Sequence, residues 1–327
     1  MKKKKICIFP RLGDESNIQQ ILLRQILEED FDLIEGSWKS MLLKTYDIIL
    51  INWPELFLHG KNRTIKTLLF FILITKWFIF KTSRICIIHN PVNRIIARSS
   101  FVTTALIKIS NGRIFLNSTE VIREPSDVII PNFHFIKAVG QENINHELIY
   151  DAIAFGFLSR YKNLELAIDS FKQDSGLKLL IAGKAESHEY HDDLINRIDN
   201  SRNIELIEGF MDYRELLTKI LASKIGVFLY SDIFNSAAVM LSLSCGKPVV
   251  VTECKYAEEL AQEIGAQWIY ITKKEATVDT VQQTILRAIH DAEARGASRP
   301  NFSPSRELDM NRSAYRDYIN RVLEGRT

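Results

Sequence analysis

The feature of the sequence that most restricts its fold is an alternation of short apolar runs with longer stretches of helical periodicity. Apolar runs of this length are typical of strands buried in a sheet. In the first half of the chain we predict strands at 6–9, 48–52, 85–89, 112–116 and 128–131, and helices at 18–29, 62–80 and 95–110. Strands that are separated by helices pair in parallel and form a sheet covered by helices.

The second half of the chain repeats this plan. We predict strands at 152–157, 178–182, 204–208, 225–228, 248–251 and 268–271, and helices at 163–173, 188–199, 212–222, 236–245, 256–264 and 277–294. The sequence therefore predicts an α/β fold with two Rossmann-like, doubly wound domains.

The domain boundaries follow from a polar stretch at 138–146, which we interpret as the linker. We expect an N-terminal domain over 1–140 and a C-terminal domain over 147–305. A last helix within 306–327 is expected to pack back toward the N-terminal domain. Ligands bind at the carboxyl ends of parallel strands, so we expect the site in a deep cleft between the domains.

Charge is distributed unevenly along the chain. The net charge of +2 over 327 residues argues against a nucleic-acid partner. Residues 1–140 carry 20 Lys and Arg against 12 Asp and Glu, a net charge of +8, and the remainder carries −6. A basic half joined to an acidic half indicates that the basic half meets something anionic.

The cysteines and the N-terminus indicate a cytoplasmic protein. Cys7, Cys86, Cys245 and Cys254 form neither a C-x-x-C pair nor a Cys/His cluster, so we expect reduced thiols. The apolar run 6–10 is too short for a signal peptide and is predicted to be the first strand.

Residues 61–84 hold an aromatic-rich apolar stretch. The run 68–80 is shorter than the roughly 20 residues that span a bilayer, and Lys76 interrupts it. The cations that flank it are Lys61, Arg63, Lys66, Lys81 and Arg84. Two interpretations remain open: a helix lying on an anionic membrane surface, and a buried helix followed by a core strand.

A cationic loop follows the first predicted strand of the second half. Residues 155–163 read Phe-Gly-Phe-Leu-Ser-Arg-Tyr-Lys-Asn, and a predicted helix comes next. Arg160 and Lys162 would lie at the mouth of the sheet beside the positive end of a helix, a geometry that holds phosphate. The alternative is a pair of solvated surface cations.

A second strand end precedes an uncharged helix. A predicted strand ends at Tyr230, and a helix without charged residues begins near Asn235 and Ser236. It ends at Cys245-Gly246, where glycine is the usual residue after a helix. A buried helix of this kind presents its free N–H groups and about half a positive charge at its start. Asn235 and Ser236 also suit a simple helix cap.

Other signatures are absent from the sequence. It contains no G-x-G-x-x-G, no P-loop and no G-x-S-x-G elbow, which lowers NAD(P), NTPase and hydrolase interpretations. Asp192-Asp193 falls in a predicted helix, and no Asp-x-Asp of the metal-dependent type lies at a strand end. We therefore expect no metal and no other cofactor.

Four segments carry recognisable motifs in a fixed order. They are Asn52-Trp53-Pro54-Glu55, His89-Asn90-Pro91, the cationic loop 156–163, and residues 230–250 around the uncharged helix. Together they resemble GT-B-fold glycosyltransferases that use nucleotide sugars, in particular the bacterial exopolysaccharide and mannosyltransferase-like enzymes of the family-4-type superfamily. The first resembles the H-W-P-E strand end of the acceptor domain, and the second resembles the H-N turn. The third resembles the G-x-x-R-x-Y-K-G loop, and the fourth resembles the segment that begins with Tyr and continues through Ser-Gly to G-x-P-V-V.

The resemblance implies a donor site for a nucleotide sugar such as a UDP- or GDP-sugar. Lys162, with Arg160, would neutralise the leaving diphosphate. The phosphate-binding residues around the following helix start would be Tyr230, Asn235, Ser236 and Ala237. The family's E-x7-E glutamates are replaced by Ile233 and Leu241, so a ribose-binding glutamate is not carried over.

The nucleotide base would lie at the ends of the next strands. By resemblance, Gly183 would let the base approach the backbone, and the segment from Glu208 to Phe210 would cup it. Each feature also has a plainer interpretation, a turn glycine and a strand exit respectively.

The acceptor side is assigned by resemblance to the first half. His89 would face the site with Asn90 and Arg94 nearby, and Trp53 and Gly13 would line it. Glu55 and Asp14 are the candidate general bases, and Glu55 is better placed because it follows a strand end. Either carboxylate could instead cap a helix.

We therefore expect a metal-independent glycosyltransferase that extends an oligosaccharide or a polyprenyl-pyrophosphate-linked acceptor in bacterial surface polysaccharide assembly. We expect it in the cytoplasm, at the inner face of the cytoplasmic membrane. Two alternatives remain: a noncatalytic GT-B-like protein that binds a nucleotide sugar or a partner, and another nucleotide-binding enzyme of the same fold, such as an epimerase.

Overall fold

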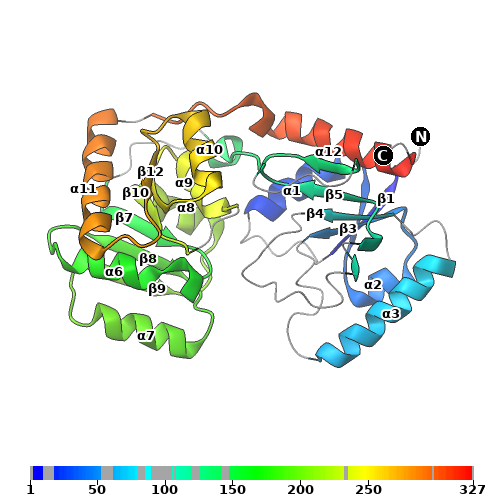
Figure 1. The fold of residues 1–327 in the computed structure, drawn as a ribbon, viewed down its shortest axis with the longest axis horizontal. Coiled ribbons are helices and arrows are strands. Elements are labelled where there is room, and N and C mark those ends of the chain that lie inside the picture. Colours follow the sequence, from blue (N-terminus) through cyan, green and yellow to red (C-terminus); the bar gives the residue numbers. More distant parts are fainter. Residues whose placement is uncertain are drawn as a thin grey trace. The chain divides into compact units, whose positions relative to one another are not determined.

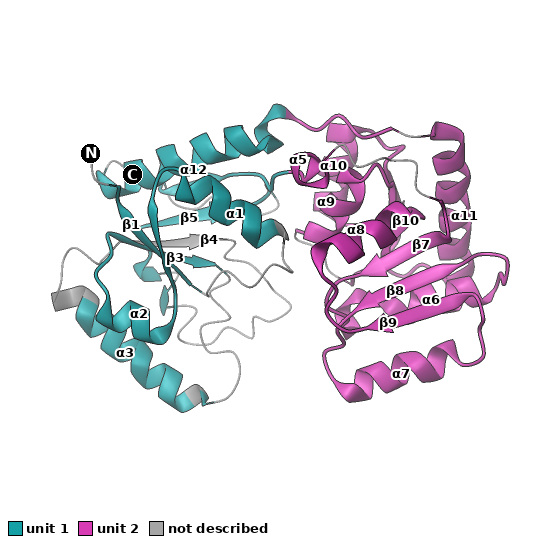
Figure 2. Ribbon diagram, turned by 180° about the vertical axis from the view of Figure 1, so that it is seen from behind, with its two compact units in different colours: residues 1–133, 304–327 teal, residues 134–303 magenta. Residues whose placement is uncertain are grey.

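The computed structural model describes residues 3–9, 18–52, 62–79, 85–89, 105–106, 108–118, 125–140, 147–231, 235–296 and 298–325. The chain divides into two compact units, 1–133 with 304–327 (unit 1) and 134–303 (unit 2) (Figure 2). Each unit contains a six-stranded parallel sheet. The predicted α/β class with two Rossmann-like domains is confirmed.

Unit 1 is built on a sheet of strand order β2-β1-β3-β4-β5-β6 (Figure 1). Its strands are β1 (Lys5–Phe9), β2 (Asp32–Glu35), β3 (Ile48–Asn52), β4 (Ile85–His89), β5 (Gly112–Phe115) and β6 (Asp127–Ile129). Its helices include α1 (Ile18–Glu28), α2 (Trp38–Leu43), α3 (Arg63–Ile79) and α12 (Leu308–Leu323). The runs of Ile and Leu in β1 and β3 are fully buried, because helices cover both faces of a parallel sheet.

The last helix, α12, packs on unit 1. Arg312 donates from Nε to Oδ2 of Asp30 at 2.8 Å, just beyond α1. The Tyr318 hydroxyl donates to the carbonyl of Ser126 at 2.5 Å. A Cβ on Gly112 would lie 2.1 Å from this hydroxyl, so β5 needs glycine where α12 crosses it.

Unit 2 is built on a sheet of strand order β12-β11-β10-β7-β8-β9. Its strands are β7 (Tyr150–Phe155), β8 (Leu179–Gly183), β9 (Ile204–Glu208), β10 (Ser223–Phe228), β11 (Val249–Thr252) and β12 (Ile269–Thr272). Its helices are α5 (Ile136–Val139), α6 (Leu164–Lys172), α7 (His188–Ile198), α8 (Tyr213–Leu221), α9 (Ala237–Ser244), α10 (Lys255–Ile264) and α11 (Val278–Arg295).

Alternate residues of the strand β10 lie on opposite faces of this sheet. Ile225 and Val227 belong to a core cluster with α6, α7 and α11. Gly226 faces the other side, where a Cβ would lie 2.9 Å from Oγ of Ser242 on α9. The small residue therefore lets the uncharged helix α9 lie close to the sheet.

Two elements of the structure, the strand β2 and the helix α2, were not predicted. The predicted linker 138–146 begins within the short helix α5, and its residues 141–146 lie outside the described part of the chain. The predicted helix 95–110 also falls largely outside it.

Candidate functional site

Lys162 is a buried cation at the carboxyl end of β7. It lies in a single turn of 3₁₀ helix, Arg160–Lys162, and is 6% exposed. Its Nζ donates to the carbonyl of Phe155 at 3.1 Å and lies 5.3 Å from the ring centroid of Tyr230. Within the described residues, no carboxylate lies at ion-pair distance from this ammonium group.

Burial lowers the pKa of Lys162 from its ordinary value of 10.5 to about 7. Removing an ammonium group from water disfavours its charged form, and no neighbouring anion compensates here. A bound anion would supply the missing partner and favour the protonated form. The site is therefore suited to a ligand that carries negative charge.

The turn that follows β10 is fixed against the Lys162 loop. The backbone N–H of Ser231 donates to the carbonyl of Tyr161 at 2.8 Å. The rings of Tyr161 and Tyr230 meet edge to face, with their centroids 5.6 Å apart. Two strand ends that are about 70 residues apart in the sequence therefore form one surface.

The helix α9 begins beside this surface. Ser236 is its N-cap, and its side chain accepts from the N–H of Val239 at 3.3 Å. Ala237 is the first helical residue, and Asn235, which is partly exposed, precedes the cap. The start of a helix carries about half a positive charge and free N–H groups. Tyr230 lies against both Ser236 and Lys162, so the buried ammonium and the helix start are near one another. A cation near a helix start is the kind of surface that suits an anion, and its role in phosphate binding stays a prediction.

Arg160 lies apart from this arrangement. Its guanidinium donates from Nη2 to Oδ2 of Asp193 on α7 at 2.7 Å, and it lies 5.0 Å from the Tyr190 ring centroid. The structure thus brings Lys162, Tyr230 and Ser236 together but directs Arg160 toward α7. Of the two predicted cations, only Lys162 lies near the start of α9.

Glycines end the neighbouring strands β7, β8 and β9. Gly156, Gly183 and Gly209 have φ angles of +95°, +151° and +128°. A Cβ on Gly183 would lie 1.8 Å from the carbonyl oxygen of Gly156, so this position requires glycine because β7 and β8 approach closely there. The close approach of β7 and β8 therefore supports the plainer interpretation of Gly183, which is a glycine required by the local backbone.

Glu208 and Phe210 flank the third of these glycines. Glu208 is exposed at the end of β9, in register with Gly183. The Phe210 side chain is 73% exposed, and Nζ of Lys184 lies 5.1 Å from its ring centroid. An exposed aromatic ring beside a strand end offers a flat surface for a planar ligand.

Comparisons with known proteins identify the kind of protein to which this chain is similar. Residues 141–301 match the family described as glycosyl transferases group 1. A GDP-mannose:glycolipid 4-beta-D-mannosyltransferase from Xanthomonas campestris is 22% identical over 246 residues, which is 73% of this chain and 70% of that protein. The protein is a glycosyltransferase of the GT-B fold.

Solved structures agree on the fold of this glycosyltransferase. Sucrose-phosphate synthase from Thermosynechococcus elongatus superposes with a TM-score of 0.64 at 13% identity, covering 98% of this chain and 95% of that one. Alr3699/HepE of Anabaena in complex with UDP-glucose superposes with a TM-score of 0.63 at 13% identity, covering 98% and 99%.

Several predicted residues of the glycosyltransferase lie outside the described part of the chain. They are Gly13, Asp14, Trp53, Glu55, Asn90 and Arg94. His89 ends β4 in register with Asn52 and Ile114, and its side chain is likewise not described. The acceptor-side assignments therefore stay predictions.

The structure accommodates leucine at the second position of the E-x7-E motif. Leu241 is 3% exposed within α9 and packs in the interior of unit 2. Ile233, at the first position, lies outside the described residues. In the described ranges, no group of three His, Cys, Asp or Glu side chains is arranged to hold a metal ion.

Two residues beside these strand ends were not singled out from the sequence, Tyr161 and Lys184. Tyr161 joins the two strand ends through its carbonyl and ring, which no local pattern reveals. Lys184 directly follows the glycine that ends β8. The Gly-Phe, Gly-Lys and Gly-Phe pairs after three successive strands, at 156–157, 183–184 and 209–210, are the signal that could have drawn attention to it.

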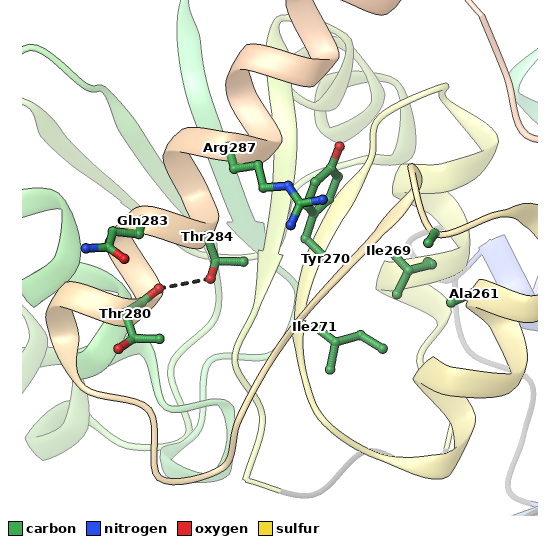
Figure 3. Close-up of a pocket in the computed structure, with 9 residues that line it drawn as sticks. Ala261, Ile269, Tyr270, Ile271, Thr280, Gln283, Thr284 and Arg287 are labelled. Atoms are coloured by element: carbon green, nitrogen blue, oxygen red, sulfur yellow. Dashed lines mark hydrogen bonds between the residues drawn. The ribbon is translucent and has the colours of Figure 1, made fainter.

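A separate hollow of about 440 Å³ lies at the edge strand β12 (Figure 3). Its lining residues are Ala261, Ala266, Ile269, Tyr270, Ile271, Thr280, Gln283, Thr284 and Arg287. The Thr284 hydroxyl donates to the carbonyl of Thr280 at 2.9 Å, which the dashed line marks. None of the lining residues belongs to the Lys162 loop or to α9, so this hollow is separate from the surface around Lys162.

Proposed function

We propose that the glycosyltransferase moves a sugar from a nucleoside diphosphate sugar to an oligosaccharide or polyprenyl-pyrophosphate-linked acceptor in bacterial surface polysaccharide assembly. The observation that carries this proposal is Lys162, a buried side chain near the start of α9 that pairs with no carboxylate of the described residues. A leaving diphosphate develops negative charge as the bond to the sugar breaks. A preorganised cation and helix start stabilise that charge without reorganisation.

The relatives support the two halves of this reaction. The Xanthomonas relative is named for transfer from GDP-mannose to a glycolipid, and the Anabaena structure contains UDP-glucose. Tyr230, Asn235, Ser236 and Ala237 would surround the diphosphate beside Lys162. Glu55, Asp14 and His89 are the proposed acceptor-side groups, with a carboxylate as general base for the acceptor hydroxyl.

An exposed apolar face on α3 favours an acceptor presented at a membrane. Ile65, Leu68, Phe71 and Ile72 are each between 47% and 61% exposed, on a helix that also buries Phe70 and Leu73 in the core. The sequence left open a helix on a membrane surface and a buried helix. The structure has features of both, because the helix has one buried face and one exposed apolar face. We propose that the exposed face inserts shallowly into an anionic leaflet.

Lys76 has a different role from the flanking cations. Its Nζ donates to the carbonyls of Met41 and Lys44 at 2.7 and 2.8 Å, at the end of α2. A cation at the end of a helix stabilises the unpaired carbonyls there. The interruption of the apolar run is thus explained by packing within unit 1. Among the described helices, none has the length and apolar character to cross a membrane.

Transfer is tested with the full-length protein, nucleoside diphosphate sugars and a bacterial membrane extract as acceptor source. We expect a radiolabelled sugar to move into the lipid fraction, and Lys162→Ala to lower this transfer by about 100-fold or more with the fold intact. The proposal fails if no donor is consumed by the wild-type protein, or if Lys162→Ala transfers sugar at the wild-type rate.

Membrane contact is tested by flotation with vesicles of phosphatidylglycerol and phosphatidylcholine at low salt. We expect binding to the anionic vesicles and its loss in Phe71→Glu. Leu286→Glu is the matched control, because Leu286 is 40% exposed on α11 of unit 2. Equal binding of both variants, or no binding of the wild type, would remove this part of the proposal and leave the donor reaction untouched.

A further inference from the structure

Four aromatic rings form a continuous row at the carboxyl ends of β7 and β10. Phe155 ends β7 and Phe228 ends β10, and their rings meet edge to face with centroids 5.5 Å apart. The Phe228 ring meets Tyr230 at 5.9 Å, and Tyr230 meets Tyr161 at 5.6 Å. All three contacts are edge to face, which is a favourable arrangement of aromatic pairs. The row is therefore a well-defined packing unit.

Phe228 is the interior member of this row. Its side chain is 1% exposed, so it acts on the surface only through its neighbours. A Cβ on Gly226 would lie 2.7 Å from the Phe228 ring, so β10 needs glycine there for the ring to keep its place. The small residue of β10 thus makes room for the ring as well as for α9.

The ammonium group of Lys162 lies against the same row. Its Nζ donates to the carbonyl of Phe155 and lies 5.3 Å from the Tyr230 ring centroid, so both contacts come from members of the row. A Cβ on Gly156 would lie 3.1 Å from Nζ, so this glycine leaves space for the ammonium group. A lysine side chain is long and flexible. Contacts from two strands therefore hold its charge at one place.

Tyr230 also joins Lys162 to the start of α9. Its hydroxyl group shares a hydrogen bond with the side chain of Ser236, the N-cap of that helix. One residue thus contacts the buried lysine through its ring and the helix cap through its hydroxyl group. Charges stabilise a leaving group best when they are held in position before the reaction.

We propose that Tyr230 and Phe228 are positioning residues, which set the Lys162 ammonium group and the start of α9 so that both act on the same leaving diphosphate. This inference rests on the proposed function, because the diphosphate is the group on which the two would act. Phe228 supports the Tyr230 ring from the interior, and Tyr230 transmits this support to Lys162 and Ser236. The role of Tyr230 is therefore exerted through its neighbours.

The groups that face Lys162 make its charge sensitive to the Tyr230 ring. Burial raises the pKa of both phenols, Tyr161 and Tyr230, so they stay neutral near pH 7. Arg160, on the same turn, is paired with Asp193. A ring face stabilises a cation, so it opposes the burial that lowers the pKa of Lys162 to about 7. Replacing the ring by a flexible apolar side chain should lower this pKa further.

Steady-state kinetics of the full-length protein test the positioning role, with the donor that the transfer assay identifies. Phe228→Leu is expected to lower kcat by about 10- to 100-fold and to change KM less than about threefold, because the charge is kept but displaced. Phe171→Leu is the matched control, since Phe171 is fully buried on α6 in the core of the same unit. It should leave kcat close to the wild-type value. Equal losses of kcat in the two variants would overturn the role of Phe228.

The pH dependence of nucleotide binding tests the contact between the ring and the ammonium group. GDP and UDP are titrated calorimetrically over a range of pH, and comparison with the wild type cancels the ionisation of the nucleotide. Tyr230→Met should move the midpoint of the affinity profile down by about half a pH unit to one unit. Tyr230→Phe, which keeps the ring, should leave the midpoint in place.

The outcomes separate this inference from the proposed function. An unchanged or raised midpoint in Tyr230→Met would show that the ring only covers Lys162, and would overturn the positioning role while the transfer reaction stands. A midpoint that moves equally in Tyr230→Phe would show that the ring face is not the cause. If the wild-type protein binds neither nucleotide, the proposed function itself fails.

Discussion

Two apolar helices of this glycosyltransferase have different surroundings. The helix α9 carries no charged residue, and its residues from Val239 to Ser244 are all buried. The helix α3 is also strongly apolar, but it exposes Ile65, Leu68, Phe71 and Ile72. Similar composition therefore leads to a buried helix in unit 2 and to a half-exposed helix in unit 1.

The neighbours of each helix explain this difference. The helix α9 lies against β10 and β11, and the segment at Phe135 covers it, where the N–H of Phe135 donates to Oγ of Ser244 at 2.9 Å. The helix α3 contributes Phe70 and Leu73 to the core cluster that it shares with α2 and the sheet. Burial thus depends on what packs against the second face of a helix, and an uncovered apolar face indicates a role at a surface.

The largest expected effect concerns the start of α9. Lys162→Ala should lower kcat/KM for sugar transfer by about 100- to 1000-fold, because it removes the charge that we propose to meet the leaving diphosphate. Arg160→Ala should change it less than about threefold, because Arg160 forms a surface pair with Asp193. Steady-state kinetics of both variants check this ranking, and a larger loss in Arg160→Ala would reverse the assignment of the two cations.

The second prediction compares the two helices directly. Leu243→Ala in α9 should lower the free energy of unfolding by about 2–5 kcal/mol, because Leu243 is fully buried. Leu68→Ala in α3 should change it by less than about 0.5 kcal/mol, because Leu68 is 61% exposed. Urea unfolding of the two variants measures both values. Similar losses would show that the exposed face of α3 is covered within the protein.

The third prediction concerns pH and Lys162. Between about pH 7 and its ordinary pKa of 10.5, the unfolded chain holds this proton and the folded protein does not. Lys162 therefore makes the stability rise with pH across this window, by at most about 1.4 kcal/mol per pH unit. Thermal unfolding of Lys162→Met should show a stabilisation over the wild type at pH 6.5 that disappears by pH 10. A constant difference between the two would contradict the lowered pKa.

Protonation of Lys162 also makes the nucleotide affinity depend on pH. The affinity is expected to fall as the pH rises, whereas the stability is expected to rise. A diphosphate binds the charged form of Lys162, so GDP affinity should fall by up to about tenfold per pH unit above pH 7. Lys162→Met should have weak affinity that no longer shows this dependence. Calorimetric titration at several pH values checks the slope.

The smallest expected effect concerns the cap of α9. Ser236→Ala should cost about 1 kcal/mol of stability, and so should Ser187→Ala, which removes the equivalent cap of α7. Only Ser236→Ala should also weaken the binding of a nucleoside diphosphate, by a few-fold, because α9 begins at the proposed phosphate position. An equal effect of both caps on nucleotide affinity would show that the α9 start is not part of the site.

The elements that were missed from the sequence have local reasons. The strand β2 reads Asp-Leu-Ile-Glu, with a charged residue at each end and no buried position, because it lies at the edge of its sheet. The helix α2 has only six residues and depends on a capping box between Ser37 and Ser40. Neither is long enough to show a clear period, whereas the buried strands β3 and β11 are continuous apolar runs.

The sequence by itself determined the two α/β domains, the buried character of α9, and the position of Lys162 at a strand end, because these depend on local periodicity and on the order of strands and helices. The tertiary structure decided which cation faces the helix start and which face of α3 stays uncovered. It also decided that the Lys184 ammonium lies over the ring of Phe210. These outcomes depend on contacts between residues far apart in the chain, such as Arg160 with Asp193 and Ser231 with Tyr161, and side-chain partners of this kind leave no periodic signal in the sequence.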